Sequence, residues 1–232
     1  IEGLRPLNKH IRTLPGLASM ARGQSDYSQL NELDINDLLA REPSVADEAL
    51  LQSQVKDQVV LVTGAGGSIG SELCRQVLQR KPKVLLLFDL SELALYTLNN
   101  ELQKILHQLS QAESVRMAGG ENQSKASKNN SANINLMPRI IPLLGSVTDE
   151  NRVSDVVSTW RPTIIYHAAA VKHVPIVEQN ITECVKTNIF GTLVMTKVAI
   201  EWQVDRFILV STDKAVNPTN AMGASKRCCE LI

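Results

Sequence analysis

The chain has 232 residues, with 24 Lys and Arg against 24 Asp and Glu, so its formal net charge is zero. A neutral chain has no electrostatic attraction to nucleic acid or to an anionic membrane surface, and we expect no nucleic-acid partner. Hydrophobic residues make up 44% of the sequence, enough for the core of one full domain. The four cysteines form no CxxC pair, so we interpret them as reduced thiols of a cytoplasmic protein. We expect no metal site.

Residues 1–56 predict a linker with short amphipathic helices at 13–21 and 30–43. From residue 57 onward, short apolar runs alternate with stretches of helical periodicity. The apolar runs predict buried parallel strands at 59–63, 83–89, 139–144, 163–170 and 206–212. The helical stretches predict helices at 68–80, 91–109, 148–160, 180–203 and from about 221. This alternation is typical of a doubly wound parallel α/β sheet over residues 57–232.

Residues 110–137 interrupt the alternation. They are polar, rich in Ser, Asn, Gly and Lys, and nearly free of large apolar side chains. Such a segment cannot bury enough apolar surface to offset its ordering entropy, so we expect a flexible surface insertion.

A glycine-rich segment, TGAGGSIGSEL, lies between the first predicted strand and the helix at 68–80. Glycines at this point allow a tight turn and a close approach of the backbone to a pyrophosphate, which then lies at the positive end of the helix. A merely flexible loop is the alternative, but the strand–loop–helix setting favours dinucleotide binding. The expected cofactor contacts are Gly64, Ala65, Gly67, Ser68, Ile69 and Gly70.

Asp89 ends the second predicted strand, about 20 residues past the glycines, where an acid holds the adenosine ribose hydroxyls. An acid repels a ribose phosphate, so this residue favours NAD over NADP. A solvent-facing Asp at a strand end is the alternative. The small residues Ala168, Ala169 and Ala170 end the fourth strand and would let a cofactor lie against the backbone, although alanines are also ordinary packing.

Ligands of open parallel sheets bind beyond the carboxyl ends of the strands. The fifth strand ends in Thr212, Asp213 and Lys214, which bring a hydroxyl, an acid and an amine to that edge and could exchange protons there. A solvated charge pair is an equally good interpretation of the spacing alone. Met222 and Lys226 are four residues apart and share a helix face. This is the spacing of the YxxxK pair of short-chain dehydrogenases, but a thioether cannot exchange a proton.

Six segments together resemble one family: TGAGGSIGSELCRQ, LLLFDLSELALY, LGSVTD, YHAAAVKHVP, TNIFGT and STDKAVNPTNAMGASKR. They are similar to the nucleotide-sugar 4,6-dehydratases of polysaccharide biosynthesis, the CapD/WbpM-like branch of the extended short-chain dehydrogenases. The resemblance covers about residues 30–232. It implies a Rossmann fold, a retained NAD and a UDP-N-acetylhexosamine substrate, namely UDP-N-acetylglucosamine. The methionine form is similar to the branch that retains the configuration at sugar carbon 5.

The resemblance also implies residue roles. Lys214 would be the base for the proton on sugar carbon 5, and Asp213 the acid for the hydroxyl leaving carbon 6. Thr212 would assist removal of the proton from the hydroxyl on carbon 4, with Lys226 nearby and in contact with the nicotinamide ribose. Further implied cofactor contacts are Ser146, Val147, Ala168, Ala169, Ala170 and Asn188. The implied substrate contacts are Lys172, His173, Asn217 and Asn220.

Members of this family have a substrate lobe that would follow the last residue here, and larger members have membrane helices upstream. The chain therefore resembles an internal fragment, at the cytoplasmic face of the membrane if the parent protein is anchored there. By analogy, helices 180–203 and 221–232 would form a homo-oligomer contact. Two alternatives stay open: an NAD-dependent nucleotide-sugar epimerase or oxidoreductase, and a non-catalytic NAD-binding fragment. Met222 argues against the first, and the Thr212–Lys214 triplet against the second.

Overall fold

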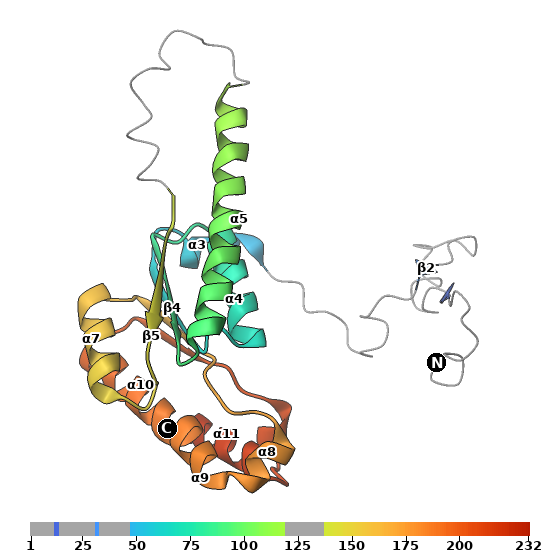
Figure 1. Cartoon of the computed structure of the whole chain (residues 1–232), viewed down its shortest axis with the longest axis vertical. Helices are drawn as coiled ribbons and strands as arrows, with labels where there is room; N and C mark the ends of the chain where they lie inside the picture. The colour runs from blue at the N-terminus through green and yellow to red at the C-terminus, as the bar shows by residue number, and fades with distance from the viewer. Residues whose placement is uncertain (1–11, 14–30, 33–46, 119–136) are drawn as a thin grey trace. The chain divides into compact units, whose positions relative to one another are not determined.

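The computed structural model describes residues 12–13, 31–32, 47–118 and 137–232 (Figure 1). The chain divides into two units, residues 1–47 and 48–232. In the first unit, β1 (Arg12–Thr13) pairs antiparallel with β2 (Asn31–Glu32). The helices predicted at 13–21 and 30–43 are wrong where the structure describes them, because Thr13, Asn31 and Glu32 belong to these strands. The remainder of both stretches lies outside the described residues. The second unit begins with α3 (Glu48–Val55), inside the stretch that the sequence pattern assigned to the lead-in.

The second unit contains a five-stranded parallel sheet in the order β5-β4-β3-β6-β7. The strands are β3 (Val59–Thr63), β4 (Val84–Asp89), β5 (Arg139–Leu144), β6 (Ile164–His167) and β7 (Arg206–Leu209). This arrangement confirms the doubly wound α/β fold. The chain order reverses between β3 and β6, and ligands of such sheets bind beside that point.

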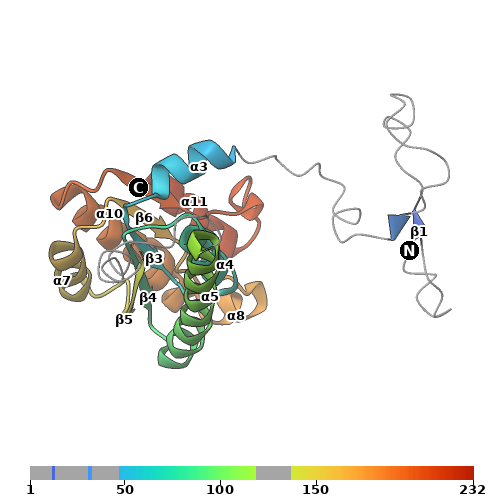
Figure 2. The same cartoon turned by 90° about the horizontal axis from the view of Figure 1, so that it is seen from above.

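Helices flank the sheet (Figure 1). The longer ones are α4 (Ser68–Gln79), α5 (Glu92–Ala118), α7 (Glu150–Trp160), α10 (Gly191–Glu201) and α11 (Ala221–Leu231). The short ones are α8 (Val174–Gln179), α9 (Ile181–Cys184), the π-helix η3 (Val185–Phe190) and the 3-10 turn η4 (Asp213–Ala215). Helices α8, α9 and α11 lie beyond the carboxyl ends of the strands, at the bottom of the view in Figure 1. Figure 2 shows β3, β4 and β5 between α7 on one side and α4 with α5 on the other.

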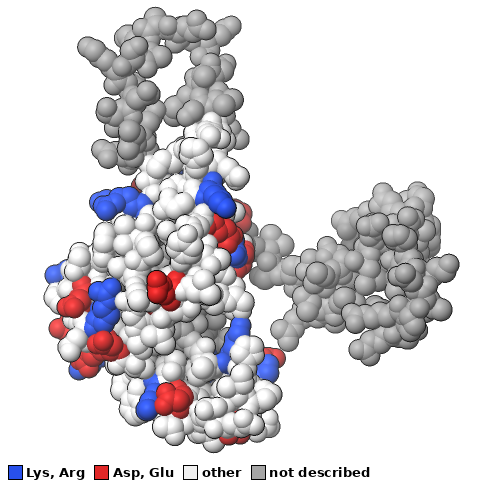
Figure 3. All heavy atoms as spheres, viewed as in Figure 1, with Lys and Arg blue, Asp and Glu red and all other residues white. Residues whose placement is uncertain are grey.

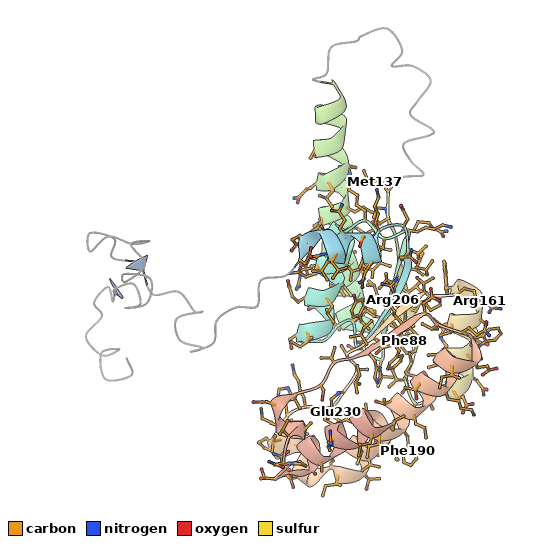
Figure 4. All side chains as sticks on the ribbon, turned by 180° about the vertical axis from the view of Figure 1, so that it is seen from behind. Phe88, Met137, Arg161, Phe190, Arg206 and Glu230 are labelled. Carbon is orange, nitrogen blue, oxygen red and sulfur yellow. The ribbon has the colours of Figure 1, made fainter. Side chains whose placement is uncertain are left out.

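Alternating residues of the central strands enter two separate apolar cores. In β4, Leu85 and Leu87 pack with the residues of α4 and α5, whereas Leu86 and Phe88 pack with those of α7 and α10. Figure 4 shows Phe88 deep inside this unit. Because both faces of the sheet are covered, the strands are continuous apolar runs rather than alternating ones.

Two helices and two strands of the second unit differ from the sequence prediction. The helix predicted at 91–109 continues to Ala118, into the stretch assigned to the insertion, and residues 119–136 lie outside the described residues. The helix predicted at 180–203 is divided by the π-helix η3. The last two strands end at His167 and Leu209 instead of 170 and 212, because the backbone beyond them turns away from the sheet to line a cavity.

Charged side chains of both signs are mixed over the described part of the face in Figure 3. Several form surface ion pairs, among them Arg75 with Glu101, whose Nε–Oε1 distance is 2.6 Å. Within the described ranges, no helix has both the length and the apolar character needed to cross a membrane.

Replacing Gly70 with Ala would place a methyl carbon 2.0 Å from the carbonyl oxygen of Gly64. Since this oxygen belongs to the backbone, no rotamer change relieves the clash, and we expect the free energy of unfolding to fall by about 1–3 kcal/mol. The opposing gain in helix propensity is at most about 1 kcal/mol. Gly67→Ala is the matched control, because its methyl would lie 3.2 Å from the same oxygen. Urea unfolding measures both, and equal losses would contradict the steric explanation.

Candidate functional site

The carboxyl edge of the sheet holds two adjoining cavities with volumes of about 370 and 410 Å³. We call the first the lysine cavity, because Lys172, Lys214 and Lys226 line it. We call the second the acidic cavity, because Asp89 lines it. Both are lined by Gly67, Ala168, Ala170 and Val171, so they form one continuous cleft. Each cavity alone is within the size range of small-molecule sites, roughly 300–1,000 Å³.

The glycine loop forms one wall of this cleft. Gly64 has a φ of +64°, and a Cβ there would lie 2.6 Å from the backbone nitrogen of Ala169. The N–H of Gly67 donates to the carbonyl of Gly64 at 3.0 Å, which closes the turn. No side chain caps the start of α4 at Gly67, so the N–H groups of its first turn remain available for an anion.

Asp89 is held in place by backbone donors. Its Oδ2 accepts from the N–H of Gly66 at 2.8 Å, and its Oδ1 accepts from the N–H of Ser91 at 2.9 Å. Each carboxylate oxygen has a second lone pair, so the group can still accept two hydroxyl protons from a ligand in the acidic cavity. Ser146 and Val147 line the same cavity.

The segment after β6 forms the floor of the cleft. The N–H of Ala168 continues the sheet ladder by donating to the carbonyl of Thr63 at 3.1 Å, and the chain then leaves the sheet. Beyond it, the Lys172 ammonium donates a hydrogen bond to the hydroxyl of Ser68, the first residue of α4. Lys172 therefore lies beside the glycine loop, on the opposite wall of the lysine cavity.

The segment after β7 brings Ser211, Thr212 and Lys214 to the lysine cavity. Asp213 does not line either of these two cavities. The Thr212 hydroxyl donates to its Oδ1 at 3.0 Å, and the Lys214 ammonium lies 3.7 Å from the same oxygen. These are exposed contacts in a single 3-10 turn, so the three groups are close enough to exchange protons with one another.

Met222 and Lys226 of α11 line the lysine cavity from the helix face that the sequence spacing predicted. Their exposed fractions are only 4% and 6%. Burial lowers the pKa of Lys226 below its ordinary value, because the ammonium loses water. This lysine is thus a positive charge held in a largely dry place at the inner end of the cleft.

Several predicted residues lie outside both cavities. Ala65 is fully buried, and its N–H donates to the carbonyl of Phe88. His173 is the N-cap residue of α8, and Asn220 caps α11 by accepting from the N–H of Gly223 at 2.8 Å. Asn217 adopts a positive φ of 50° in the turn before α11. The structure therefore gives these four residues structural positions, and ligand contacts by their side chains remain predictions.

Asn188 does not line the cleft, but it holds Val171, which does. Asn188 is 1% exposed, and its side-chain amide pairs with both the N–H and the carbonyl of Val171, at 2.9 and 3.1 Å. It therefore supports the cleft wall from behind.

Several residues that line the cleft were not predicted from the sequence, among them Leu90, Ala94, Gly145, Thr187 and Val210. Leu90 and Gly145 follow the ends of predicted strands, which is a signal that could have identified them. Val210 lies within the strand predicted at 206–212, which ends at Leu209 in the structure. Ala94 and Thr187 lie within helices, and only the packing places them at the cleft. Among the described residues, no group of three or more His, Cys, Asp or Glu side chains is placed to hold a metal ion.

Lys226→Met should stabilise the fold near neutral pH, because the folded state no longer has to desolvate an ammonium. The pKa of Lys226 is lowered on folding from about 10.5, so the charge opposes folding below that pH. The stability difference from the wild type should therefore shrink as the pH rises from the lowered pKa of the folded state towards 10.5, and it should be lost above 10.5. Urea unfolding between pH 7 and 10.5 measures the difference. Lys214→Met, at a half-exposed position, is the control and should change stability little. A less stable Lys226→Met protein at pH 7 would refute this account.

Three curated relatives are similar to this chain in sequence. It is 34% identical over 219 residues to the capsular polysaccharide biosynthesis protein CapD of Staphylococcus aureus, covering 94% of this chain and 32% of CapD. It is 32% identical to a UDP-N-acetylglucosamine 4,6-dehydratase (inverting) of Campylobacter jejuni, covering 75% of this chain and 42% of that enzyme. A UDP-glucose 4-epimerase of Rickettsia bellii is also 32% identical, with 76% of this chain and 42% of the relative covered. The chain thus spans a third to less than half of these relatives.

Two solved structures share the fold. Pen from Bacillus thuringiensis is 31% identical with a TM-score of 0.59, covering 76% of this chain and 46% of that one. A UDP-glucose 4-epimerase from Bifidobacterium longum, in complex with NAD+ and UDP, is 20% identical with a TM-score of 0.54, covering 75% of this chain and 47% of that one. The family described as "Polysaccharide biosynthesis protein" matches residues 60–120 and 117–232. These matches confirm the resemblance found in the sequence: the chain belongs to the polysaccharide biosynthesis protein family.

Proposed function

We propose that this chain is the NAD-binding and proton-transfer part of a UDP-N-acetylglucosamine 4,6-dehydratase of the type that retains the configuration at carbon 5. The observation that carries the proposal is the single cleft that joins the glycine loop to Thr212, Lys214, Met222 and Lys226. The named relatives include 4,6-dehydratases that act on this sugar nucleotide, which supports the substrate class.

The residues of the cleft fit NAD. The glycine loop offers a backbone cradle that a Cβ would fill, and the start of α4 offers N–H groups to a diphosphate. The Asp89 carboxylate keeps free lone pairs for the adenosine ribose hydroxyls. The three lysines of the lysine cavity complement the negative charge of a diphosphate. When bound, NAD would supply the oxidation at carbon 4 of the sugar and the matching reduction at carbon 6.

The residues of the chain would move the protons. Thr212 takes part in removing the proton of the carbon 4 hydroxyl, and the buried charge of Lys226 favours the alkoxide that develops there. A ketone at carbon 4 acidifies the proton on carbon 5, and Lys214 accepts that proton and returns it to carbon 5 when carbon 6 is reduced. Asp213 donates a proton to the hydroxyl that leaves carbon 6. Because Thr212 and Lys214 both contact the Asp213 carboxylate, protons could pass between the three groups within one turn.

Met222 supports a dehydratase over an epimerase or a simple oxidoreductase. It lines the lysine cavity one helical turn before Lys226, where a proton-exchanging phenol would otherwise stand. A thioether cannot carry a proton, so the proton chemistry has to come from the Thr212–Lys214 turn. One of the relatives is named a UDP-glucose 4-epimerase, so the experiment below also tests for epimerase activity.

We also propose that the protein forms a homo-oligomer. Phe190 and Ile200 are 53% and 78% exposed, and they belong to the segment for which the sequence predicted such a contact. Figure 4 shows Phe190 at the outer side of the helical layer. Large apolar side chains exposed along one helical segment are typical of an association surface.

Asp89→Asn should weaken NAD binding by roughly tenfold, because an amide replaces charge-assisted hydrogen bonds to the ribose with neutral ones. It should also reduce the preference for NAD over NADP, since the negative charge that repels a ribose phosphate is gone. Calorimetric titration of both cofactors measures this. Asp149→Asn is the matched control, because that carboxylate only caps α7 and lines neither cavity. Unchanged NAD affinity in Asp89→Asn would contradict the assigned role.

The reaction is tested with UDP-N-acetylglucosamine deuterated at sugar carbon 4, incubated with the protein that contains this chain. A dehydratase moves the deuterium to carbon 6 with no net formation of NADH, whereas an epimerase leaves carbon 6 unlabelled. Asp213→Asn and Lys214→Ala should each lower the rate by roughly 100-fold or more, the usual contribution of a general acid or base. Mass spectrometry and NMR of the product provide the readout.

A matched control for these variants is Lys186→Ala, an exposed lysine paired with Glu183 at 2.8 Å, which lines neither cavity. Its rate should equal that of the wild type. Full activity of both Asp213→Asn and Lys214→Ala would show the role assignment to be wrong, and an unchanged sugar with NAD bound would support the non-catalytic alternative.

A further inference from the structure

A row of buried polar side chains lies behind the floor of the cleft, and the proposed proton chemistry does not use it. At its centre is His167, the last residue of β6, which is fully buried. Its Nδ1 lies 2.7 Å from the hydroxyl of Thr63, the last residue of β3. Its Nε2 lies 3.1 Å from the hydroxyl of Thr192 in α10. The two threonines are also buried, at 0% and 1% exposure.

The contacts determine where every proton in this row lies. The Thr192 hydroxyl is 2.6 Å from the carbonyl oxygen of Asn188, which can only accept, so Thr192 donates there. Thr192 therefore accepts from His167, which places a proton on Nε2. Burial lowers the pKa of His167 to about 3, so the ring is neutral and Nδ1 carries no proton. Nδ1 consequently accepts from Thr63.

The row connects both walls of the cleft to α11. At one end, Thr63 directly precedes Gly64, and its hydroxyl is 3.5 Å from the N–H of Ala169 in the cleft floor. At the other end, Asn188 pairs with the backbone of Val171 and donates to the hydroxyl of Ser225 at 2.9 Å. Ser225 directly precedes Lys226.

The carbonyl of Asn188, in the π-helical turn Val185–Phe190, is an acceptor shared by several elements. It accepts from the N–H of Gly191, from the Thr192 hydroxyl at 2.6 Å and from the Cys229 thiol of α11 at 3.1 Å. Single π-helical turns inside α-helices are frequent at functional sites. Replacing both partners of a buried hydrogen bond by apolar groups of the same shape can be nearly neutral for stability, so packing alone does not require the polar row.

We propose that His167, as a neutral ring with its proton on Nε2, is a positioning residue that couples the glycine loop and the cleft floor to the helix carrying Lys226. It does not touch the ligand. It sets the distance between the loop that binds the diphosphate and the lysine at the nicotinamide end. This inference rests on the proposed binding of NAD in the cleft. It adds His167 as the residue that fixes the distance between the glycine loop and Lys226.

The first experiment reads the proton position directly and needs no ligand. A long-range proton–nitrogen NMR spectrum of the nitrogen-15-labelled protein separates the two ring nitrogens of each histidine, and His167→Gln identifies the signals of His167. We expect a protonated Nε2, a bare Nδ1 and no titration between pH 8 and 5. A proton on Nδ1, or a ring that titrates in this range, would overturn the proposal.

The second experiment separates positioning from stability. Thr192→Val removes the hydroxyl with little change of shape, and we expect NAD to bind about tenfold more weakly. Thr192→Ser keeps the hydroxyl and should restore most of the affinity. Thr196→Val is the matched control, since this hydroxyl lies one turn further along α10 and bonds only to the carbonyls of Thr192 and Leu193. Binding is measured by calorimetry well below the melting temperature of each variant.

The outcomes are distinct. If Thr192→Val and Thr196→Val lower stability alike and leave NAD affinity unchanged, the row is structural and the proposal is wrong. If the wild-type protein does not bind NAD at all, the proposed function fails instead, while the NMR spectrum still reports whether the protons are arranged as inferred.

Discussion

The site depends on how closely two backbones approach each other where β3 and β6 end. Gly64, at a positive φ, packs against Ala168 and Ala169 with no room for a side chain. Because of this contact, the glycine loop and the cleft floor meet and enclose the same cleft. It lies where the strand order reverses, so helices on both sides of the sheet diverge and leave the cleft open. A side chain at position 64 would push both walls apart and change both cavities together.

The interior of the second unit is apolar on both faces of the sheet and polar beneath the site. The two cores that cover the sheet are apolar and supply most of the burial, as the packing of Leu86 and Phe88 against α7 and α10 illustrates. Under the site, by contrast, His167, Asn188 and Lys226 are buried. Buried polar groups are costly unless they are hydrogen-bonded, and both His167 and Asn188 are fully engaged. The burial of apolar side chains in the two cores thus offsets the cost of burying these polar side chains beneath the cleft.

Charge is distributed unequally along the cleft. Lysines line one cavity, and Asp89 lines the other. A ligand with hydroxyls at one end and a diphosphate near its middle would match this order, with the diphosphate at the uncapped start of α4. The Asp89 carboxylate would then bind ribose hydroxyls at one end of the ligand, and the N–H groups at the start of α4 would bind its diphosphate.

The sequence by itself determined the alternation of strands and helices, the glycine loop, the position of Asp89 and the shared helix face of Met222 and Lys226. These features follow from spacing along the chain, because strand and helix periodicity and the length of one βαβ unit are local properties. Only the tertiary structure decided that Lys172 reaches Ser68, that Asp213 lies outside the cavity wall, and that His167 joins Thr63 to Thr192. Those contacts join residues between 25 and 104 positions apart. Which of them meet depends on how the helices pack on the sheet, and periodicity carries no information about that.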